Sequence, residues 1–207
     1  MSRRSIGLAS AFLVIAVVSA ACGGSSATPA PAVGATPTPG VAGAVPSGHP
    51  DNDLAALFPK TVAGAPLTVT TRTGQDFAAS SGQGDETAQA QEKQLTDFVA
   101  SQGKSISDFS IGFGGGRTPE GETYIVEAFR LKGGDANAVE TALLPLLAAG
   151  GPAPQTSQVQ VGGRTMSKVL GLAAVGGQDA YLYPKNDVVW LVSATDPILT
   201  EIANQLT

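Results

Sequence analysis

Few residues of this chain are of the types that catalysis uses most often. The only histidine, His49, lies in a Pro- and Gly-rich stretch, and the only cysteine, Cys22, lies near the N-terminus. Residues 51–207 therefore lack the side chains of Ser-His-Asp and Cys-His catalysis and of histidine- or thiolate-based metal and haem sites. Carboxylates, lysines and tyrosines remain for chemistry there. We expect neither a metal site nor a cofactor.

Two polar patterns lack the context that their chemistry needs. His49 is followed by Pro50, Asp51 and Asp53, but a metal site requires several fixed ligands with supporting hydrogen bonds, so we predict a solvent-exposed linker histidine. Ser101-Gln102-Gly103-Lys104 has the Ser-x-x-Lys spacing of penicillin-recognising enzymes. Those enzymes place the pair at the start of a helix, whereas Gly103 is predicted to end one here. We interpret neither pattern as an active site.

A glycine-rich stretch, Gly112-Phe113-Gly114-Gly115-Gly116-Arg117, has the composition of a phosphate-binding loop. Its spacing matches neither the dinucleotide fingerprint nor the P-loop, and both motifs lead into a helix, whereas a strand is predicted next. We therefore predict a flexible hairpin loop over residues 114–121.

Three glutamates near this loop are the remaining candidates for acid–base chemistry. Glu120 and Glu122 lie in the predicted loop, and Glu127 alternates with apolar neighbours on the predicted strand that follows. Solvation or a salt bridge accounts for all three, so we predict no catalytic residue among them.

Apolar periodicity and turn residues predict the elements of residues 51–207. A short turn over 52–59 precedes a strand over 66–72. A Ser/Gly loop follows, and Asp85 then caps a helix that ends near Gln102. The next predicted elements are a hairpin of strands 107–113 and 123–131 and a helix capped by Asp135 and interrupted by Pro145. Two further hairpins follow, with strands 157–161 and 164–170 around Gly162-Gly163 and strands 180–183 and 188–194 around a loop over 184–187. The last predicted element is a helix that Asp196 caps and that begins at Pro197.

This order predicts an α+β fold with a mainly antiparallel sheet of six or seven strands and two or three helices. The first six elements have the succession of a ferredoxin-like, split βαβ unit. Thr61-Val62-Ala63-Gly64 parallels Gln160-Val161-Gly162-Gly163, and each half closes with a strand, an aspartate and a helix. We therefore keep an internal duplication as a hypothesis.

The last predicted hairpin carries apolar residues on both faces. Tyr181, Tyr183 and Trp190 fall on one face, and Leu182 and Leu191 on the other. Either this hairpin is central and covered on both sides, or its aromatic face stays open and binds a partner or a sugar-like ligand by stacking.

The N-terminus has the layout of a bacterial export signal. Arg3 and Arg4 precede an apolar run of roughly 16 residues, which is short for a membrane span. The run ends in Ser19-Ala20-Ala21-Cys22, which resembles the lipobox of bacterial lipoproteins, although that family usually has Leu where Ser19 stands. The resemblance implies cleavage between Ala21 and Cys22 and a diacylglyceryl group on Cys22.

Residues 23–50 are almost wholly Gly, Ala, Ser, Thr, Pro and Val, so they cannot bury enough apolar surface to fold. They form a predicted tether of roughly 30 Å. The chain is thus organised as a signal peptide over 1–21, a lipidated cysteine and tether over 22–50, and one globular domain over 51–207.

Without the signal peptide, 10 basic residues face 17 acidic ones, a net charge of −7, and the basic residues are not clustered. Nucleic acid is therefore not an expected partner, because its recognition needs grouped Lys and Arg. We expect a lipid-anchored protein on the outer face of the bacterial cytoplasmic membrane or in the cell envelope. Its expected role is non-catalytic binding of an envelope protein or a small ligand. A small hydrolase that uses carboxylates and a lipid carrier remain the alternatives.

Overall fold

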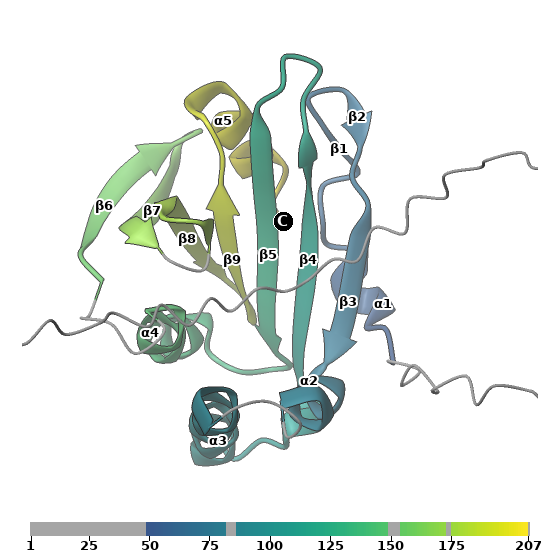
Figure 1. Ribbon diagram of the computed structural model, residues 1–207, viewed down its shortest axis with the longest axis vertical. Coiled ribbons are helices and arrows are strands. Elements are labelled where there is room, and N and C mark those ends of the chain that lie inside the picture. Colours follow the sequence, from purple (N-terminus) through teal and green to yellow (C-terminus); the bar gives the residue numbers. More distant parts are fainter. Residues whose placement is uncertain (1–48, 82–85, 149–153, 173–174, 207) are drawn as a thin grey trace, which may run out of the picture. The chain divides into compact units, whose positions relative to one another are not determined.

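The computed structural model describes residues 49–81, 86–148, 154–172 and 175–206. Within these ranges the fold is α+β, as predicted, with a seven-stranded antiparallel sheet and a separate two-stranded one (Figure 1). Gly48–Thr207 forms one compact unit. The elements, in order, are α1 (Asn52–Ala55), β1 (Thr61–Val62), β2 (Ala65–Pro66), β3 (Val69–Thr73), α2 (Gly74–Ser81), α3 (Glu86–Ser101), the 3₁₀ helix η1 (Ile106–Asp108), β4 (Phe109–Arg117), β5 (Thr123–Leu131), α4 (Ala136–Leu147), β6 (Thr156–Val161), β7 (Arg164–Leu172), β8 (Gln178–Lys185), β9 (Val188–Ser193) and α5 (Asp196–Gln205).

The large sheet consists of two meanders that meet at its centre. Its strand order is β3-β4-β5-β9-β8-β7-β6, and every neighbouring pair is antiparallel. The chain order of the first half has the predicted succession. However, β3 and β4, which α2 and α3 connect, are antiparallel neighbours rather than the parallel strands of a split βαβ unit.

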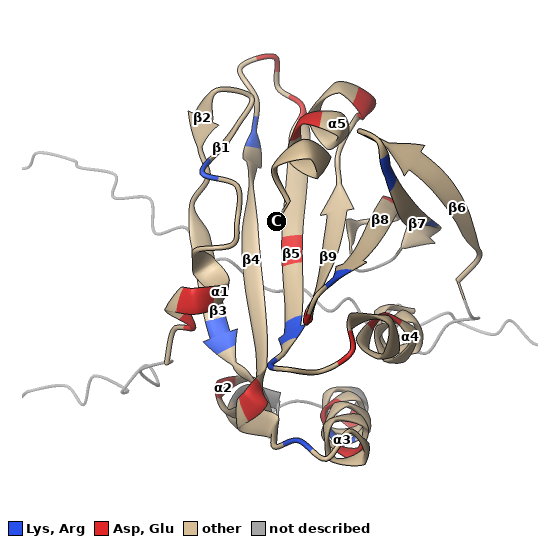
Figure 2. Cartoon of the chain, turned by 180° about the vertical axis from the view of Figure 1, so that it is seen from behind, with Lys and Arg blue, Asp and Glu red and all other residues tan. Residues whose placement is uncertain are grey.

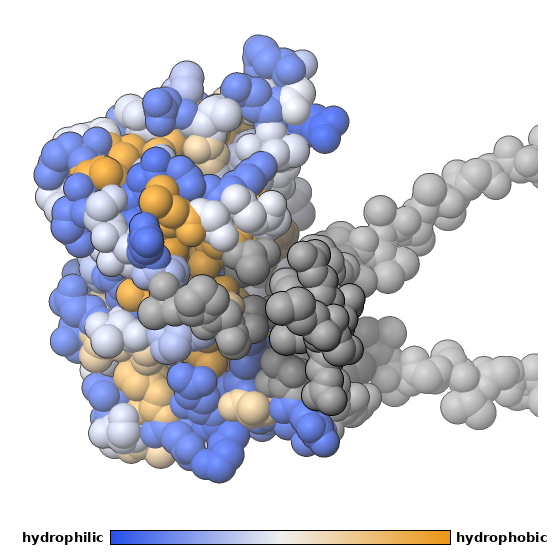
Figure 3. Space-filling view, turned by 60° about the vertical axis from the view of Figure 1, so that its left-hand side comes forward, coloured by the Kyte–Doolittle hydropathy of each residue, from blue (hydrophilic) through white to orange (hydrophobic). Residues whose placement is uncertain are grey.

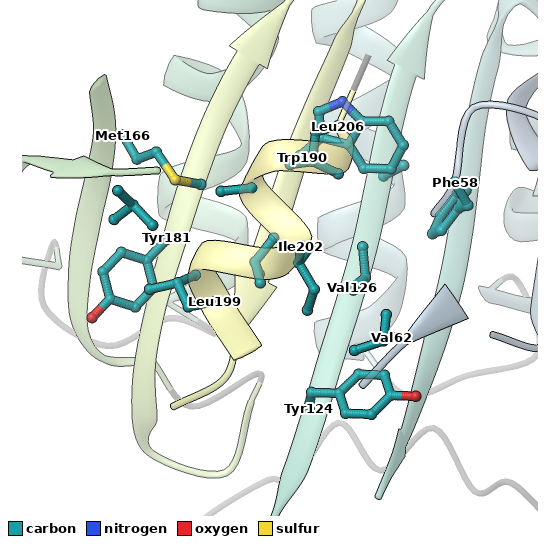
Figure 4. Close-up of a cluster of buried hydrophobic side chains, with 14 of the residues drawn as sticks. Phe58, Val62, Tyr124, Val126, Met166, Tyr181, Trp190, Leu199, Ile202 and Leu206 are labelled. Carbon is teal, nitrogen blue, oxygen red and sulfur yellow. The ribbon is translucent and has the colours of Figure 1, made fainter. Parts of the chain in front are cut away.

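The two faces of the sheet carry separate apolar cores. The stripe of α5 that contains Ile198 and Ile202 packs over Val126 and Trp190 on one face (Figure 4). The stripe of α4 that contains Val139 and Leu143 packs on the opposite face, with Phe129, Val189 and Leu191. The first half of the chain ends with α4 and the second half with α5, and these helices cover opposite faces of the sheet. A duplicated pair of halves is therefore not related by a two-fold axis perpendicular to the sheet.

The similar segments Thr61–Gly64 and Gln160–Gly163 nevertheless form two similar turns. Ala63 and Gly64 adopt φ values of +50° and +76°, and Gly162 and Gly163 adopt +56° and +77°. Both pairs close hairpins with two-residue loops, the geometry that requires positive φ. Both hairpins contact α5, so the helix lies between them.

The predicted Ser/Gly loop contains a helix that sequence analysis missed. Asp76 N–H donates to Thr73 Oγ1 at 3.4 Å, and Thr73 Oγ1 donates to Asp76 Oδ2 at 2.8 Å, which caps the start of α2. The Thr-x-x-Asp spacing is the sequence signal of such a cap. With α1 and α2, the described residues hold five α-helices instead of two or three.

Three helix ends test the other predictions. Asp135 caps α4 as expected, because its Oδ1 accepts from Asn137 N–H at 2.9 Å. The helix continues past Pro145 to Leu147. Asp196 is the first residue of α5 rather than its cap, and Thr195 precedes it. The predicted cap of α3, Asp85, lies outside the described residues.

The glycine-rich stretch is part of strand β4 and not a flexible loop. Gly112 pairs with Thr71 and Ala128, and a Cβ atom there would lie 2.6 Å from the ring of Phe58. Gly114 and Gly116 stand on the same face and bring the strand close to Leu67 and Tyr124. Absence of side chains therefore allows neighbouring residues to pack directly on β4.

This packing predicts that Gly112→Ala destabilises the protein. The added methyl group overlaps the Phe58 ring, and overpacking of this kind costs about 1–3 kcal/mol. Urea unfolding followed by circular dichroism measures the loss. Combining Gly112→Ala with Phe58→Leu should cost less than the sum of the two single changes, and strict additivity would contradict the proposed contact.

Candidate functional site

The aromatic face of the β8–β9 hairpin is covered and does not form an open binding surface. Trp190 is 0% exposed and Tyr181 is 9% exposed. Phe58 meets Trp190 edge to face, with ring centroids 5.0 Å apart, and residues of α5 pack on the same face (Figure 4). The open-surface hypothesis for Tyr181, Tyr183 and Trp190 is therefore wrong, and the hairpin belongs to the covered centre of the sheet.

The register of this hairpin also differs from the prediction. Tyr183 pairs with Trp190 and Lys185 with Val188, so the loop has two residues instead of four, with Asn186 at a φ of +56°. Tyr183 is half-buried, and its hydroxyl accepts a hydrogen bond from Arg164 Nη1 at 2.8 Å. A shift of two residues keeps each side chain on its face, so the predicted faces are correct.

Other polar residues singled out in the sequence do not form a site together. The side chain of His49 is 82% exposed, and its backbone N–H donates to Asp76 Oδ2 at 2.7 Å. Ser101 Oγ donates to the Phe98 carbonyl at 2.6 Å, within the last turn of α3. Glu120 is exposed, and Glu122, also exposed, accepts from Thr195 at 3.1 Å. Ala21 and Cys22 lie outside the described residues.

A polar cleft of about 380 Å³ lies at one end of the sheet. It is formed where the start of α1, the end of β3, η1, the start of β4 and the end of β5 meet. Figure 2 shows acidic positions on α1 and a basic position at this end of β5. The lining residues are Pro50, Asp51, Asn52, Asp53, Thr73, Ser107, Asp108, Ser110, Arg130 and Lys132. Sequence analysis missed this cleft because its lining comes from four separate segments.

Asp51 is the residue around which the cleft is built. Its Oδ1 accepts from Leu54 N–H at 2.9 Å and so caps α1, while its Oδ2 accepts from the buried hydroxyl of Ser110 at 2.7 Å. Burial by itself would raise the pKa of Asp51. The hydrogen bonds from Leu54 and Ser110, together with the charge of Arg130, outweigh burial and hold this pKa below its usual value.

Arg130 stands beside Asp51 and is fixed from its other side by the β8–β9 turn. Its Nε donates to Asp187 Oδ2 at 3.0 Å, and the two side chains are 18% and 20% exposed. Gly133 N–H donates to the same oxygen at 3.2 Å. The guanidinium therefore has a fixed orientation at the edge of the cleft.

The remaining charges complete a surface of mixed sign. Asp108 accepts from Ser105 N–H at 2.9 Å in a capping box, while Asp53 and Lys132 are exposed. No group of three or more metal-binding side chains occurs in the part of the chain that the structure describes. The cleft thus offers fixed charged and hydrogen-bonding groups, and its two bonded carboxylates already serve as helix caps.

Glu127 lies on β5, three residues from Arg130, and so on the opposite face of the sheet. It is half-buried, and none of the described residues forms a hydrogen bond or an ion pair with it, so of the two expected explanations, solvation and a salt bridge, the salt bridge is not found. Burial raises its pKa to about 7. The carboxyl group best suited to exchange a proton near neutral pH is therefore outside the cleft.

Comparisons with known proteins give no relative from which to infer a role. No protein family, no curated protein and no solved structure matches this chain at a significant level. The candidate site therefore depends on the chain's own geometry.

The Glu127 environment predicts that stability falls as the pH rises from about 4.5 to about 7. The folded protein holds the Glu127 proton more tightly than the unfolded chain does, so the contribution of Glu127 to stability is full below pH 4.5 and is lost as the pH rises through about 7. Urea unfolding at several pH values should show a decrease of up to roughly 3 kcal/mol over this window. Glu127→Gln should remove this part of the pH dependence.

Glu120→Gln, in the exposed loop before β5, is the matched control and should keep the wild-type profile. Retention of the full decrease in Glu127→Gln would assign the pH dependence to another group.

Proposed function

We propose that this protein is a lipid-anchored binding module on the outer face of the bacterial cytoplasmic membrane. The lipobox-like Ser19-Ala20-Ala21-Cys22 supports the anchor and the address. The compact unit Gly48–Thr207 follows the predicted tether directly. No helix among the described residues has both the length and the apolar character that a membrane crossing requires.

The observation that carries a binding role is the state of the charged groups in the cleft. A general acid works best with a pKa near the working pH, which for a carboxyl group means a raised pKa. Asp51 has a lowered pKa, and both Asp51 and Asp108 are held in helix caps. These carboxylates are better suited to orient a ligand than to transfer protons, which favours binding over carboxylate-based hydrolysis.

The lining of the cleft also indicates the class of ligand. Arg130 and Lys132 can donate hydrogen bonds to a carboxylate or phosphate group of a ligand. Asp53 and Asp108 can accept hydrogen bonds from an ammonium or hydroxyl group. An acyl chain would leave these charged groups without water or partners, so this cleft disfavours lipid carriage. We infer a small polar ligand, zwitterionic or anionic.

The anchor predicts a defined modification. Protein extracted from its own membrane should begin at Cys22 and carry a diacylglyceryl group, which intact-mass measurement detects. Cys22→Ala should abolish the modification and release or misprocess the protein. A mature chain with another N-terminus and an unmodified Cys22 would refute the anchor without affecting the cleft.

The cleft predicts ligand-dependent stabilisation. A thermal-shift screen of amino acids, phosphate and sugar acids should find at least one compound that raises the melting temperature, because binding to the folded state stabilises it. Lys132→Ala should weaken the effect about tenfold or more in apparent affinity. Lys93→Ala, at an exposed position on α3, is the control and should bind normally. Equal binding by the Lys132→Ala variant would exclude this cleft.

A further inference from the structure

Strand β6 forms one edge of the large sheet. It is the last strand in the order, and among the described residues it pairs only with β7, from Thr156 opposite Val169 to Val161 opposite Arg164. Its outer side faces away from the rest of the sheet (Figure 1). Edge strands of this kind present unpaired N–H and C=O groups.

The hydrogen-bonding pattern between β6 and β7 shows which backbone groups of β6 are unpaired. Leu170 N–H donates to the Gln155 carbonyl at 3.3 Å, so Gln155 is bonded toward β7. Antiparallel strands alternate, so residues 157, 159 and 161 also bond toward β7. The backbone N–H and C=O groups of Thr156, Gln158 and Gln160 therefore point outward, and all three residues are exposed.

The strand lacks the features that usually protect an edge. Thr156–Val161 contains no charged residue, proline or glycine, and its pairing with β7 is continuous. Figure 2 shows β6 without Lys, Arg, Asp or Glu. The side view in Figure 3 shows hydrophobic residues only in separate patches on a largely hydrophilic surface. The opposite edge, β3, is shorter, carries the exposed Arg72 and contacts α1 and α2.

We propose that β6 pairs with β6 of a second copy of this chain, antiparallel and about a two-fold axis at Gln158. This register places Gln158 opposite Gln158 and Thr156 opposite Gln160. It uses all three outward-facing residues of each copy, which gives about six backbone hydrogen bonds. A continuous sheet of fourteen strands results.

The uncharged composition of β6 suits pairing with a second copy of β6 better than pairing with a charged strand of another protein. In a symmetric pair a charged residue at the two-fold axis would face the same charge in the other copy, and β6 has no charged residue. The Gln158 amide donates one hydrogen bond to Ser167 Oγ at 2.9 Å and keeps a second N–H and its carbonyl oxygen, so two copies of Gln158 can still bond to each other. The pairing is short and polar, so the dimer is weak in dilute solution, and anchoring both copies to one membrane would strengthen it. The dimer itself does not depend on that anchor.

Disulfide trapping of the full chain tests the proposal. Paired residues that exchange hydrogen bonds have Cα atoms about 5.5 Å apart, within the range that a disulfide bridges. Gln158→Cys in membranes or detergent should therefore give a cross-linked dimer under mild oxidation. Thr70→Cys on the β3 edge, and the wild-type chain, should not.

A proline substitution gives an independent measurement. Gln158→Pro removes an outward N–H and the side-chain hydrogen bond to Ser167, but it leaves the backbone hydrogen bonds to β7, so the monomer should keep its circular dichroism spectrum. Dimerisation of the full chain, measured by sedimentation, should weaken at least tenfold. A wild-type chain that stays monomeric at about 100 µM and gives no Gln158→Cys dimer in membranes overturns the proposal. So does a Gln158→Cys cross-link that goes only to a different envelope protein.

Discussion

The contact between Phe58 and Trp190 is the interaction on which the rest of the structure depends. Trp190 stands at the centre of the sheet, and Phe58 lies over it at 5.0 Å from a segment more than 130 residues earlier in the chain. Gly112 makes this contact possible, because any side chain there would occupy the space of the Phe58 ring. Trp190 is also the residue whose buried Nε1 has no hydrogen-bond partner among the described residues. The apolar packing of the indole therefore outweighs the cost of an unpaired donor, about 1–3 kcal/mol.

The same contact positions the cleft. The segment from Asp51 to Phe58 is held at one end by the hydrogen bond between Asp51 and Ser110 and at the other end by Phe58 in the core. Asp51 and Arg130 line the same cleft because Ser110, which donates to Asp51, lies opposite Arg130 on the β4–β5 pair. Polar groups that secure the N-terminal segment to the sheet thus also form the wall of a potential binding site.

The two faces of the sheet impose different conditions on carboxyl groups. On the face of α1, Asp51 receives hydrogen bonds that favour its charged form. On the face of α4, burial of Glu127 favours its neutral form. Hydrogen bonds and desolvation therefore separate the pKa values of two carboxyl groups that lie on or against the same pair of strands. The charged cleft is the proposed binding site, whereas Glu127 links stability to pH.

Local patterns in the sequence determined the fold class, most of the elements and the faces of the strands. The apolar stripes of α4 and α5, the Gly162-Gly163 turn and the alternation through Tyr181 and Trp190 each depend on residues close together in the chain, where spacing alone decides. The predicted loop before Val188 was two residues too long, but a shift of two residues leaves each side chain on the predicted face of the strand. The alternating glycines of β4 carried a period-two signal that composition concealed.

Tertiary structure decided the strand order, the burial of Trp190 and the cleft. The strand order depends on how the chain returns after α4, which no local pattern specifies. Trp190 is buried because Phe58 and α5 meet over it, and Phe58 is more than 130 positions away in the sequence. Asp51 and Ser110, which define the cleft, are separated by 59 positions. Contacts at such distances exist only once the whole chain has folded, so residue spacing could not reveal them.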